Sequence, residues 1–225
     1  MKKVSLIAIS ALCLLTTGAL AQSKSVEVGG TTFGVRAGLN FQNINGRDGA
    51  DNKLENKMVP GFHVGVNAEI PVAPEFYVQP GLLFTTKGAK YEPGVLGEPK
   101  VRLSYIEVPV NVLYKPVVGN GKLLLGFGPY VAYGIGGNVN TDQGDIKVKF
   151  KGKVTESIFE QDAVYYKPFD AGANFVFGYE FNNRFSTQLN AQLGLVNINS
   201  DNDAFPDSDA RSANTGFGVS VGYRF

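Results

Sequence analysis

Hydrophobic and polar residues alternate along most of the chain with the period of two that is typical of β-strands. In the first such stretch, Phe33, Val35 and every second residue up to Phe41 are apolar, whereas Arg36 lies in the opposite phase. Eight segments have this pattern, and one face of each contains no charged residue: 31–42, 61–70, 76–87, 105–115, 123–135, 169–181, 184–195 and 216–225. The alternation therefore predicts an all-β fold of eight strands.

The connections between these strands alternate between short and long. Strands two and three, four and five, and six and seven are joined by the short runs 71–75, 116–121 and 182–183. The other connections are long and polar, at 43–57, 88–100, 137–163 and 198–212. Short turns at one end and long loops at the other are typical of an outer membrane barrel. We therefore expect an eight-stranded antiparallel up-and-down transmembrane β-barrel with short periplasmic turns and long extracellular loops.

The positions of the charged residues indicate which face of each strand contacts lipid. A Lys or Arg on the lipid face costs about 2 to 4 kcal/mol at the bilayer midplane. Charged residues of the strands lie in the phase opposite to the apolar face, among them Arg36, Glu69, Lys87, Glu107, Lys115, Glu180, Arg184 and Arg224. A soluble barrel would have the reverse arrangement, with apolar residues inside. The apolar faces are therefore predicted to contact lipid and the charges to face the lumen.

Residues 1–21 have the layout of a secretory signal peptide. Lys2 and Lys3 form a basic start, residues 4–15 are apolar, and Ala19 and Ala21 are small residues of the kind that precede a cleavage site. Because the apolar run is short, cleavage is favoured over an uncleaved anchor helix. We expect export through the Sec pathway and three parts: the signal peptide 1–21, a periplasmic segment 22–30 and the barrel 31–225.

Composition excludes some partners and folds. The chain has 21 basic and 20 acidic residues, so nucleic-acid binding has no support. Its one cysteine, Cys13, lies in the signal peptide, and the cleaved chain is therefore not held by disulfides. No apolar run long enough for a transmembrane helix follows the signal peptide. The stability of the cleaved chain must therefore come from its core, from a sheet closed on itself or from a membrane.

The predicted lumen contains the candidate site. An eight-stranded barrel is just wide enough for side chains to fill its interior. The charged residues assigned to this lumen network are Arg36, Glu69, Glu107, Lys115, Glu180 and Arg224. Because charges with little water around them need partners, we predict a structural ion-pair network. A narrow channel for small solutes is the alternative.

No residue pattern supports catalysis. His63 is the only histidine and lies in the inward phase, where a hydrogen-bonding role is favoured over a catalytic one. A lipid-deacylating barrel would use a His-x-Ser pair, but position 65 is glycine. No phosphate-binding loop or cysteine–histidine cluster is present. We therefore expect no enzymatic activity and no cofactor, and a lipid A-modifying enzyme is the third hypothesis.

Two long loops contain candidate interaction residues. The third loop alternates Lys147, Lys149, Lys151 and Lys153 with apolar residues. It is predicted to pair with residues 156–166 as a hairpin above the membrane, and a solvated strand extension is favoured over a partner site. The fourth loop contains the acidic residues Asp201, Asp203, Asp207 and Asp209. These are weak candidates for calcium, because the loop lacks the glycine of a standard calcium loop.

Four stretches resemble the outer membrane β-barrel domain that is common in Bacteroidetes and includes PorT-like proteins. They are SYIEVPVNVLY at 104–114, LGFGPYVAYGIGG at 125–137, FDAGANFVFGYEF at 169–181 and GVSVGYRF at 218–225. In size the chain also resembles barrels of the OmpX and OmpA type. The resemblance implies the barrel fold and, through PorT, a link to protein secretion. Because the sequence contains no catalytic pattern, we expect a non-enzymatic protein with a structural or interaction role in the envelope through its extracellular loops.

The last strand ends on an aromatic residue, which resembles the signal read by the outer membrane assembly machinery. The residues of this candidate signal are Phe217, Val219, Val221, Tyr223 and Phe225. The expected partners are outer membrane lipid and lipopolysaccharide, the assembly machinery during biogenesis, and an unidentified protein at the extracellular loops. We expect the barrel to be a monomer, since closure leaves no free strand edge in lipid.

Overall fold

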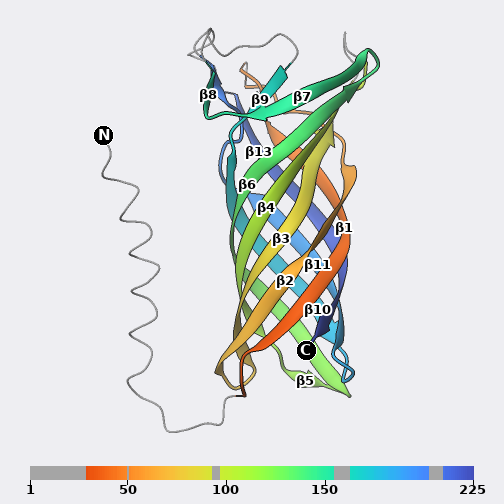
Figure 1. Ribbon diagram of the computed structural model, residues 1–225, viewed down its shortest axis with the longest axis vertical. Helices are drawn as coiled ribbons and strands as arrows, with labels where there is room; N and C mark the ends of the chain where they lie inside the picture. Colours follow the sequence, from red (N-terminus) through yellow and green to blue (C-terminus); the bar gives the residue numbers. More distant parts are fainter. Residues whose placement is uncertain (1–28, 50, 93–96, 155–162, 203–209) are drawn as a thin grey trace, which may run out of the picture.

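The computed structural model describes residues 29–49, 51–92, 97–154, 163–202 and 210–225. Most of these residues form one closed antiparallel barrel (Figure 1). Its eight strands are β1 (Thr32–Arg47), β2 (Val59–Ala73), β3 (Phe76–Lys90), β4 (Lys100–Tyr114), β6 (Gly121–Thr141), β10 (Phe169–Glu180), β11 (Phe185–Gly194) and β13 (Arg211–Arg224). Each pairs with the next in this order, and β13 pairs with β1 to close the barrel. The predicted fold class is confirmed.

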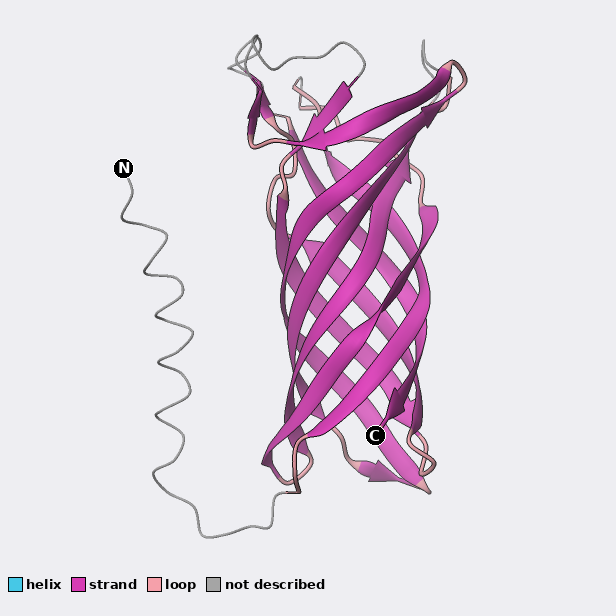
Figure 2. Cartoon of the chain, viewed as in Figure 1, coloured by secondary structure: helices cyan, strands magenta, loops and turns pink. Residues whose placement is uncertain are grey.

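Five short strands lie at the two ends of the barrel. β5 (Val117–Val118) lies at the end that carries the short turns, where the C-terminus also lies (Figure 1). The opposite end carries four more: β7 (Gly144–Phe150), β8 (Lys153–Val154), β9 (Ala163–Tyr166) and β12 (Asp201–Asn202). Colouring by secondary structure shows strands and loops but no helix in the described part of the chain (Figure 2). In that part, no helix is long and apolar enough to cross a membrane.

Four barrel strands extend at least five residues further toward the extracellular end than their apolar pattern predicts. β1 ends at Arg47, β4 begins at Lys100, β6 ends at Thr141 and β13 begins at Arg211. The pairing of β4 with β6 continues to Lys100 and Asn140. Beyond the membrane both faces can be polar, so the hydrogen-bonded ladder continues where the alternation of apolar residues ends. The predicted strand ends were therefore too short on the extracellular side.

Large apolar side chains cover the outer wall. Leu39 and Phe127 are 63% and 61% exposed, whereas Leu124 and Glu107 face inward and are 2% and 1% exposed. On β6 the apolar outward positions run from Leu125 to Ile135. That stretch rises about 33 Å along the strand, or about 25 Å along the axis at a tilt of about 40°, which is the height of the apolar band of an outer membrane barrel.

The strand that ends the chain closes the barrel. β13 pairs with β1 along its whole length, from Arg47–Arg211 to Gly34–Arg224. At its end the backbone N–H of Phe225 donates to the carbonyl oxygen of Phe33 at 2.8 Å. From Phe217 onward its outward residues are those of the candidate assembly signal: Phe217, Val219, Val221, Tyr223 and, directly after the strand, Phe225. The seam therefore contains no unpaired strand edge facing lipid.

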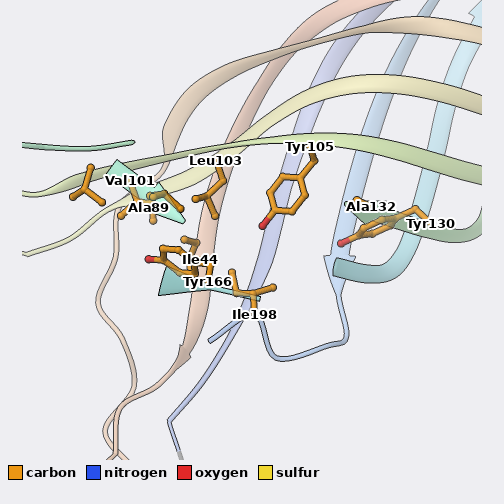
Figure 3. Close-up of a cluster of buried hydrophobic side chains, with 11 residues drawn as sticks. Ile44, Ala89, Val101, Leu103, Tyr105, Tyr130, Ala132, Tyr166 and Ile198 are labelled. Atoms are coloured by element: carbon orange, nitrogen blue, oxygen red, sulfur yellow. The ribbon is translucent and has the colours of Figure 1, made fainter. Parts of the chain in front are cut away.

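An apolar cluster fills the extracellular end of the barrel (Figure 3). Its buried members are Ile44, Ala89, Val101, Leu103, Tyr105, Tyr130, Ala132, Val139, Val148, Tyr166 and Ile198. The ring of Phe150 on β7 packs against Tyr105 with centroids 5.6 Å apart. It also lies over Gly134, where a Cβ would come within 2.3 Å of the ring. Strands β7 and β9 thus close this end with an apolar plug.

The predicted hairpin between residues 145–154 and 156–166 is wrong. β7 forms its hairpin with the end of β6, where Asn138 pairs with Lys147, and it pairs with β9 in parallel. A parallel pair cannot be a hairpin, because its strands need a longer connection. Residues 155–162 lie outside the described part of the chain. The apolar side chains of β7 face inward and pack into the apolar plug. This packing places β7 across the mouth of the barrel and not in a hairpin above the membrane.

The lipid-facing wall can be tested with a charge at mid-height. Val110 on β4 is 39% exposed and lies in the middle of the apolar stretch of its strand. We expect Val110→Lys to lower the free energy of unfolding by about 2 to 4 kcal/mol, because the ammonium group would face hydrocarbon. Urea unfolding of the protein in lipid vesicles measures the change, with Val110→Leu as the control. A loss of stability no larger than that of the control would contradict the assignment of the lipid face.

Candidate functional site in the barrel lumen

Four charged side chains form a closed ring of ion pairs near the periplasmic end of the lumen. Lys115 Nζ lies 2.6 Å from Glu69 Oε2 and 2.8 Å from Glu180 Oε2. Arg224 completes the ring, with Nη2 2.7 Å from Glu69 Oε1 and Nε 3.8 Å from Glu180 Oε2. Each cation therefore contacts both carboxylates. We call these four residues the periplasmic ring, and its net charge is zero.

The strands bring these residues together because each is an inward position near the periplasmic end of its strand. Glu69 lies on β2, Glu180 on β10 and Arg224 on β13, and Lys115 directly follows β4. Polar neighbours satisfy part of the remaining hydrogen-bonding capacity, although Nε and Nη1 of Arg224 have no hydrogen-bond partner within the described residues. Gln79 Nε2 donates to Glu69 Oε1 at 3.0 Å, and Arg224 Nη2 donates to Asn67 Oδ1 at 2.9 Å. Charges this deeply buried are tolerated only with such partners.

A second charged group lies higher in the lumen, around Lys87. Its ammonium group lies 2.9 Å from Glu107 Oε2 and 3.0 Å from Asp170 Oδ2, and the three side chains are at most 1% exposed. The same nitrogen lies 4.1 Å from the centroid of the Tyr130 ring, a cation–π geometry. Asn214 Nδ2 donates to Asp170 Oδ2 at 3.0 Å. Taken alone, one ammonium and two carboxylates would leave a buried charge of −1.

Arg36 supplies the missing positive charge. Its side chain is buried on β1 beside a cavity of about 20 Å³ that Glu107 and His63 also line. A volume of this size holds about one water molecule. Nε and Nη1 of Arg36 have no hydrogen-bond partner within the described residues. We call Arg36, Lys87, Glu107 and Asp170 the central group, and like the periplasmic ring it is neutral.

The two neutral groups together close the lumen. The periplasmic ring joins strands from opposite sides of the barrel, since β4 lies across from β13 in the strand order. Above it, Asn174 Nδ2 donates to Asn111 Oδ1 at 2.9 Å, and Gln192 Nε2 donates to Glu107 Oε1 at 2.6 Å. The apolar plug lies at the extracellular end. The arrangement can hold the wall together, and the cavity at its middle accommodates only about a water molecule.

The structure divides the predicted lumen residues between two groups. Glu69, Lys115, Glu180 and Arg224 meet in the periplasmic ring, whereas Arg36 and Glu107 belong to the central group. The predicted network omitted Lys87 and Asp170, which bridge β3 and β10. Both lie in the inward phase of their strands, so their position in the alternation was the signal that could have included them.

His63 is a lumen residue bonded to a neighbouring amide. Its Nδ1 lies 2.5 Å from Asn40 Oδ1, and Asn40 Nδ2 in turn donates to Thr85 Oγ1 at 3.0 Å. Among the described residues, no group of three or more histidine, cysteine or acidic side chains is placed to hold a metal ion. Of the acidic fourth loop, Asp201 pairs with Lys167 at 2.7 Å, and residues 203–209 lie outside the described part.

The candidate loop lysines lie at the extracellular end. Lys147 and Lys149 are on β7, Lys151 follows that strand and Lys153 begins β8. Lys147 and Lys151 are exposed. Ser200 Oγ donates to the carbonyl oxygen of Lys151 at 2.7 Å, which ties this segment to the fourth loop. These lysines are thus held on a folded extension of the barrel.

Comparisons with known proteins give a family and several solved structures. The family described as outer membrane protein β-barrel domain matches residues 20–200. A search of curated proteins found no match. Two similar solved structures are Ail of Yersinia pestis in complex with the heparin analogue sucrose octasulfate and a major outer membrane protein of Thermus thermophilus, each 14% identical. Each alignment covers 88% of this chain and 100% of the other, with TM-scores of 0.41 and 0.46. At these values the two structures indicate nothing about what this chain binds.

Removal of Lys87 tests the central group. We expect Lys87→Met to lower the free energy of unfolding by about 3 to 5 kcal/mol, because two buried carboxylates lose their shared cation. The chain has no tryptophan, so urea unfolding in detergent is followed by tyrosine fluorescence and by the gel shift between folded and boiled protein. The control Lys147→Met removes an exposed ammonium and should change stability by about 0.5 kcal/mol or less. Equal effects of the two variants would contradict the paired role of Lys87.

Proposed function

This chain belongs to the outer membrane protein β-barrel domain family, and on that premise we propose that it is a non-conducting, non-enzymatic barrel that acts through its extracellular end. Its site of action is the outer membrane. The role that we propose is an interaction within the cell envelope, in which the barrel anchors the extracellular extension and an external protein or lipid contacts it.

The observation that carries this proposal is the closed lumen. The periplasmic ring, the central group and the apolar plug follow one another along the axis of the barrel. Between them the cavity beside Arg36 has a volume of about 20 Å³. A hydrated ion needs a continuous polar path, and buried ion pairs that cross the lumen would have to break to provide one. This arrangement supports a structural lumen over a channel.

The extracellular end supports the interaction role. The extension of β6 and β7, together with β9, is packed onto the barrel by the apolar cluster. β8 and β12 pair in parallel beside it. A folded extension of this kind presents a surface with little conformational freedom to lose on binding, which lowers the entropic cost of association. The exposed Lys147 and Lys151 lie on this surface.

The surroundings of His63 support the absence of enzymatic activity. The imidazole contacts the amide of Asn40, and a general base needs a nucleophile or substrate within hydrogen-bond reach. Position 38, opposite His63 on β1, is a glycine at which a Cβ would come within 2.6 Å of the imidazole. The ring is therefore packed into the wall, which favours a structural role over the hypothesis of a lipid A-modifying enzyme.

The proposal includes three further expectations. The chain is exported by the Sec pathway with cleavage after residue 21, the assembly machinery reads the strand that ends at Phe225, and the barrel works as a monomer. The resemblance to PorT-like proteins makes protein secretion one of the envelope roles to be tested. A narrow channel for small solutes is the second candidate. It is favoured by Nε and Nη1 of Arg36, which lie beside the central cavity and have no hydrogen-bond partner within the described residues.

Single-channel recording separates the two candidates. We expect the purified protein in planar bilayers to give no steady conductance, because the lumen is crossed by ion pairs at two levels. The lumen variant Arg36→Gln with Glu107→Gln and the exterior control Lys147→Gln are recorded in parallel. A steady conductance in the unmodified protein that changes in the lumen variant and not in the control would overturn the closed-lumen proposal and favour the channel.

A further inference from the structure

The ladder between β2 and β3 is interrupted near the extracellular end. The two strands pair from the periplasmic end up to His63 and Thr85 and meet again only where Lys57 and Lys90 exchange two backbone hydrogen bonds. Residues 58–62 and 86–89 form no ladder pairs with each other. In place of a backbone hydrogen bond across the strands, the Phe62 N–H donates to the Thr86 hydroxyl at 2.9 Å.

A groove of about 320 Å³ lies at this interruption. Leu39 and Phe62 on its rim are lipid-facing side chains, 63% and 48% exposed, so the groove opens on the outer wall. It is lined by Leu39, Val59, Pro60, Gly61, Phe62, Thr86, Lys87 and Arg102. Apart from the threonine and two cationic residues, the lining is apolar. Such a surface suits a hydrocarbon chain with a charged group at one end.

Arg102 is the exposed cation of this groove. It lies on β4 between Gly88 of β3 and Asn138 of β6, neither of which is charged. No ion pair or hydrogen bond engages its guanidinium within the described residues. Lys100, the next outward residue of β4, pairs in register with Lys90. Adjacent cations without intervening carboxylates form an anion-binding surface.

The nearby carboxylates are already occupied by other lysines. Glu98 contacts Lys90 Nζ, and the hydrogen bond and charge of that lysine lower the pKa of the Glu98 carboxyl. Glu92 Oε1 lies 3.2 Å from Lys57 Nζ. Asp145 accepts from Asn140 at 2.7 Å. Arg102 and Lys100 therefore keep a positive charge that no carboxylate of the described residues neutralises by direct contact.

The height of Arg102 matches the headgroup region. The apolar outward residues of β4 begin at Ile106, two outward positions toward the membrane centre from Arg102. Those four residues rise about 13 Å along the strand, at about 3.3 Å per residue. Arg102 thus lies just above the hydrocarbon. Leu39 and Phe62, on the other side of the groove, contact the hydrocarbon.

We propose that this groove binds a phosphorylated lipid of the outer leaflet. The guanidinium of Arg102 would hold the phosphate in a bidentate contact with Lys100 beside it, and an acyl chain would pack along Leu39, Pro60 and Phe62. Free phosphate would also bind these two cations, but it would leave the apolar wall of the groove without a ligand. The combination of charge and apolar groove therefore favours a lipid.

Native mass spectrometry of the full protein in detergent tests this site. The protein is titrated with bisphosphorylated lipid A, with the same lipid after removal of its phosphates, and with inorganic phosphate as competitor. The variants are Arg102→Gln and Arg102→Lys, and Arg211→Gln serves as a matched control, since Arg211 is an exposed cation at the same end on β13. The gel shift on boiling verifies that each variant is folded.

We expect Arg102→Gln to weaken binding of the bisphosphorylated lipid about tenfold, as for loss of a charge-assisted contact. Arg102→Lys should be intermediate, and Arg211→Gln should bind as the unmodified protein does. Three results would each overturn the proposal. These are equal binding by Arg102→Gln, equal binding of the dephosphorylated lipid, and displacement of the lipid by equimolar inorganic phosphate, which would identify free phosphate as the ligand.

Discussion

The hydrocarbon of the membrane is the constraint on which this structure depends. It offers no hydrogen bonds, so each backbone group within it needs a partner in the chain, and it accepts charged side chains only at high cost. The closed ladder meets most of the first requirement, with β13 paired to β1 along the seam, and the hydroxyl of Thr86 accepts from the Phe62 N–H where the β2–β3 ladder is interrupted. The second requirement sends every charged residue at membrane height into a lumen only wide enough for side chains. Contact with lipid on the outer wall therefore requires the lumen to contain the charged side chains of the strands.

The lumen meets that demand with two neutral groups. Each consists of two cations and two carboxylates, and in the periplasmic ring each cation touches both carboxylates. Neutrality avoids the large cost of an uncompensated buried charge. The central group is less symmetric, because Lys87 bridges Glu107 and Asp170 while Arg36 lies beside a small cavity. We therefore propose that the protein acts at the ends and the outer wall of the barrel and not through its lumen.

Much of the barrel could be predicted from the sequence, because alternation with period two directly reports which side chains face lipid. Glu69 and Arg224, for example, are single charges in apolar strands, and they could be assigned to the lumen without coordinates. The grouping of the charges into two sets could not be predicted from the sequence. It depends on the shear of the barrel and the tilt of its strands, which bring side chains of β3 and β10 together across the lumen. Lys87 and Asp170 are 83 residues apart in the chain and meet only there.

The extracellular end was predicted less well for a different reason. The alternating lysines 147–153 suggested a hairpin, yet β7 pairs with β6 and β9. The apolar side chains of β7 could pack either against a hairpin partner or into the mouth of the barrel. The local sequence does not distinguish these two packing arrangements. The groove at Arg102 was also hidden from the pattern, because a break in the ladder arises from register and from the hydroxyl of Thr86.

A double-mutant cycle across the periplasmic ring tests most directly whether the lumen charges stabilise the barrel as pairs. Glu69→Gln, Lys115→Met and the double variant are unfolded with urea in detergent, and the three changes in free energy are compared. Because the two charges lie 2.6 Å apart and are at most 3% exposed, the account predicts a double variant more stable than the sum of the single losses, by about 1 to 3 kcal/mol. Losses that add to within about 0.5 kcal/mol would contradict it, since the lumen charges would then act independently.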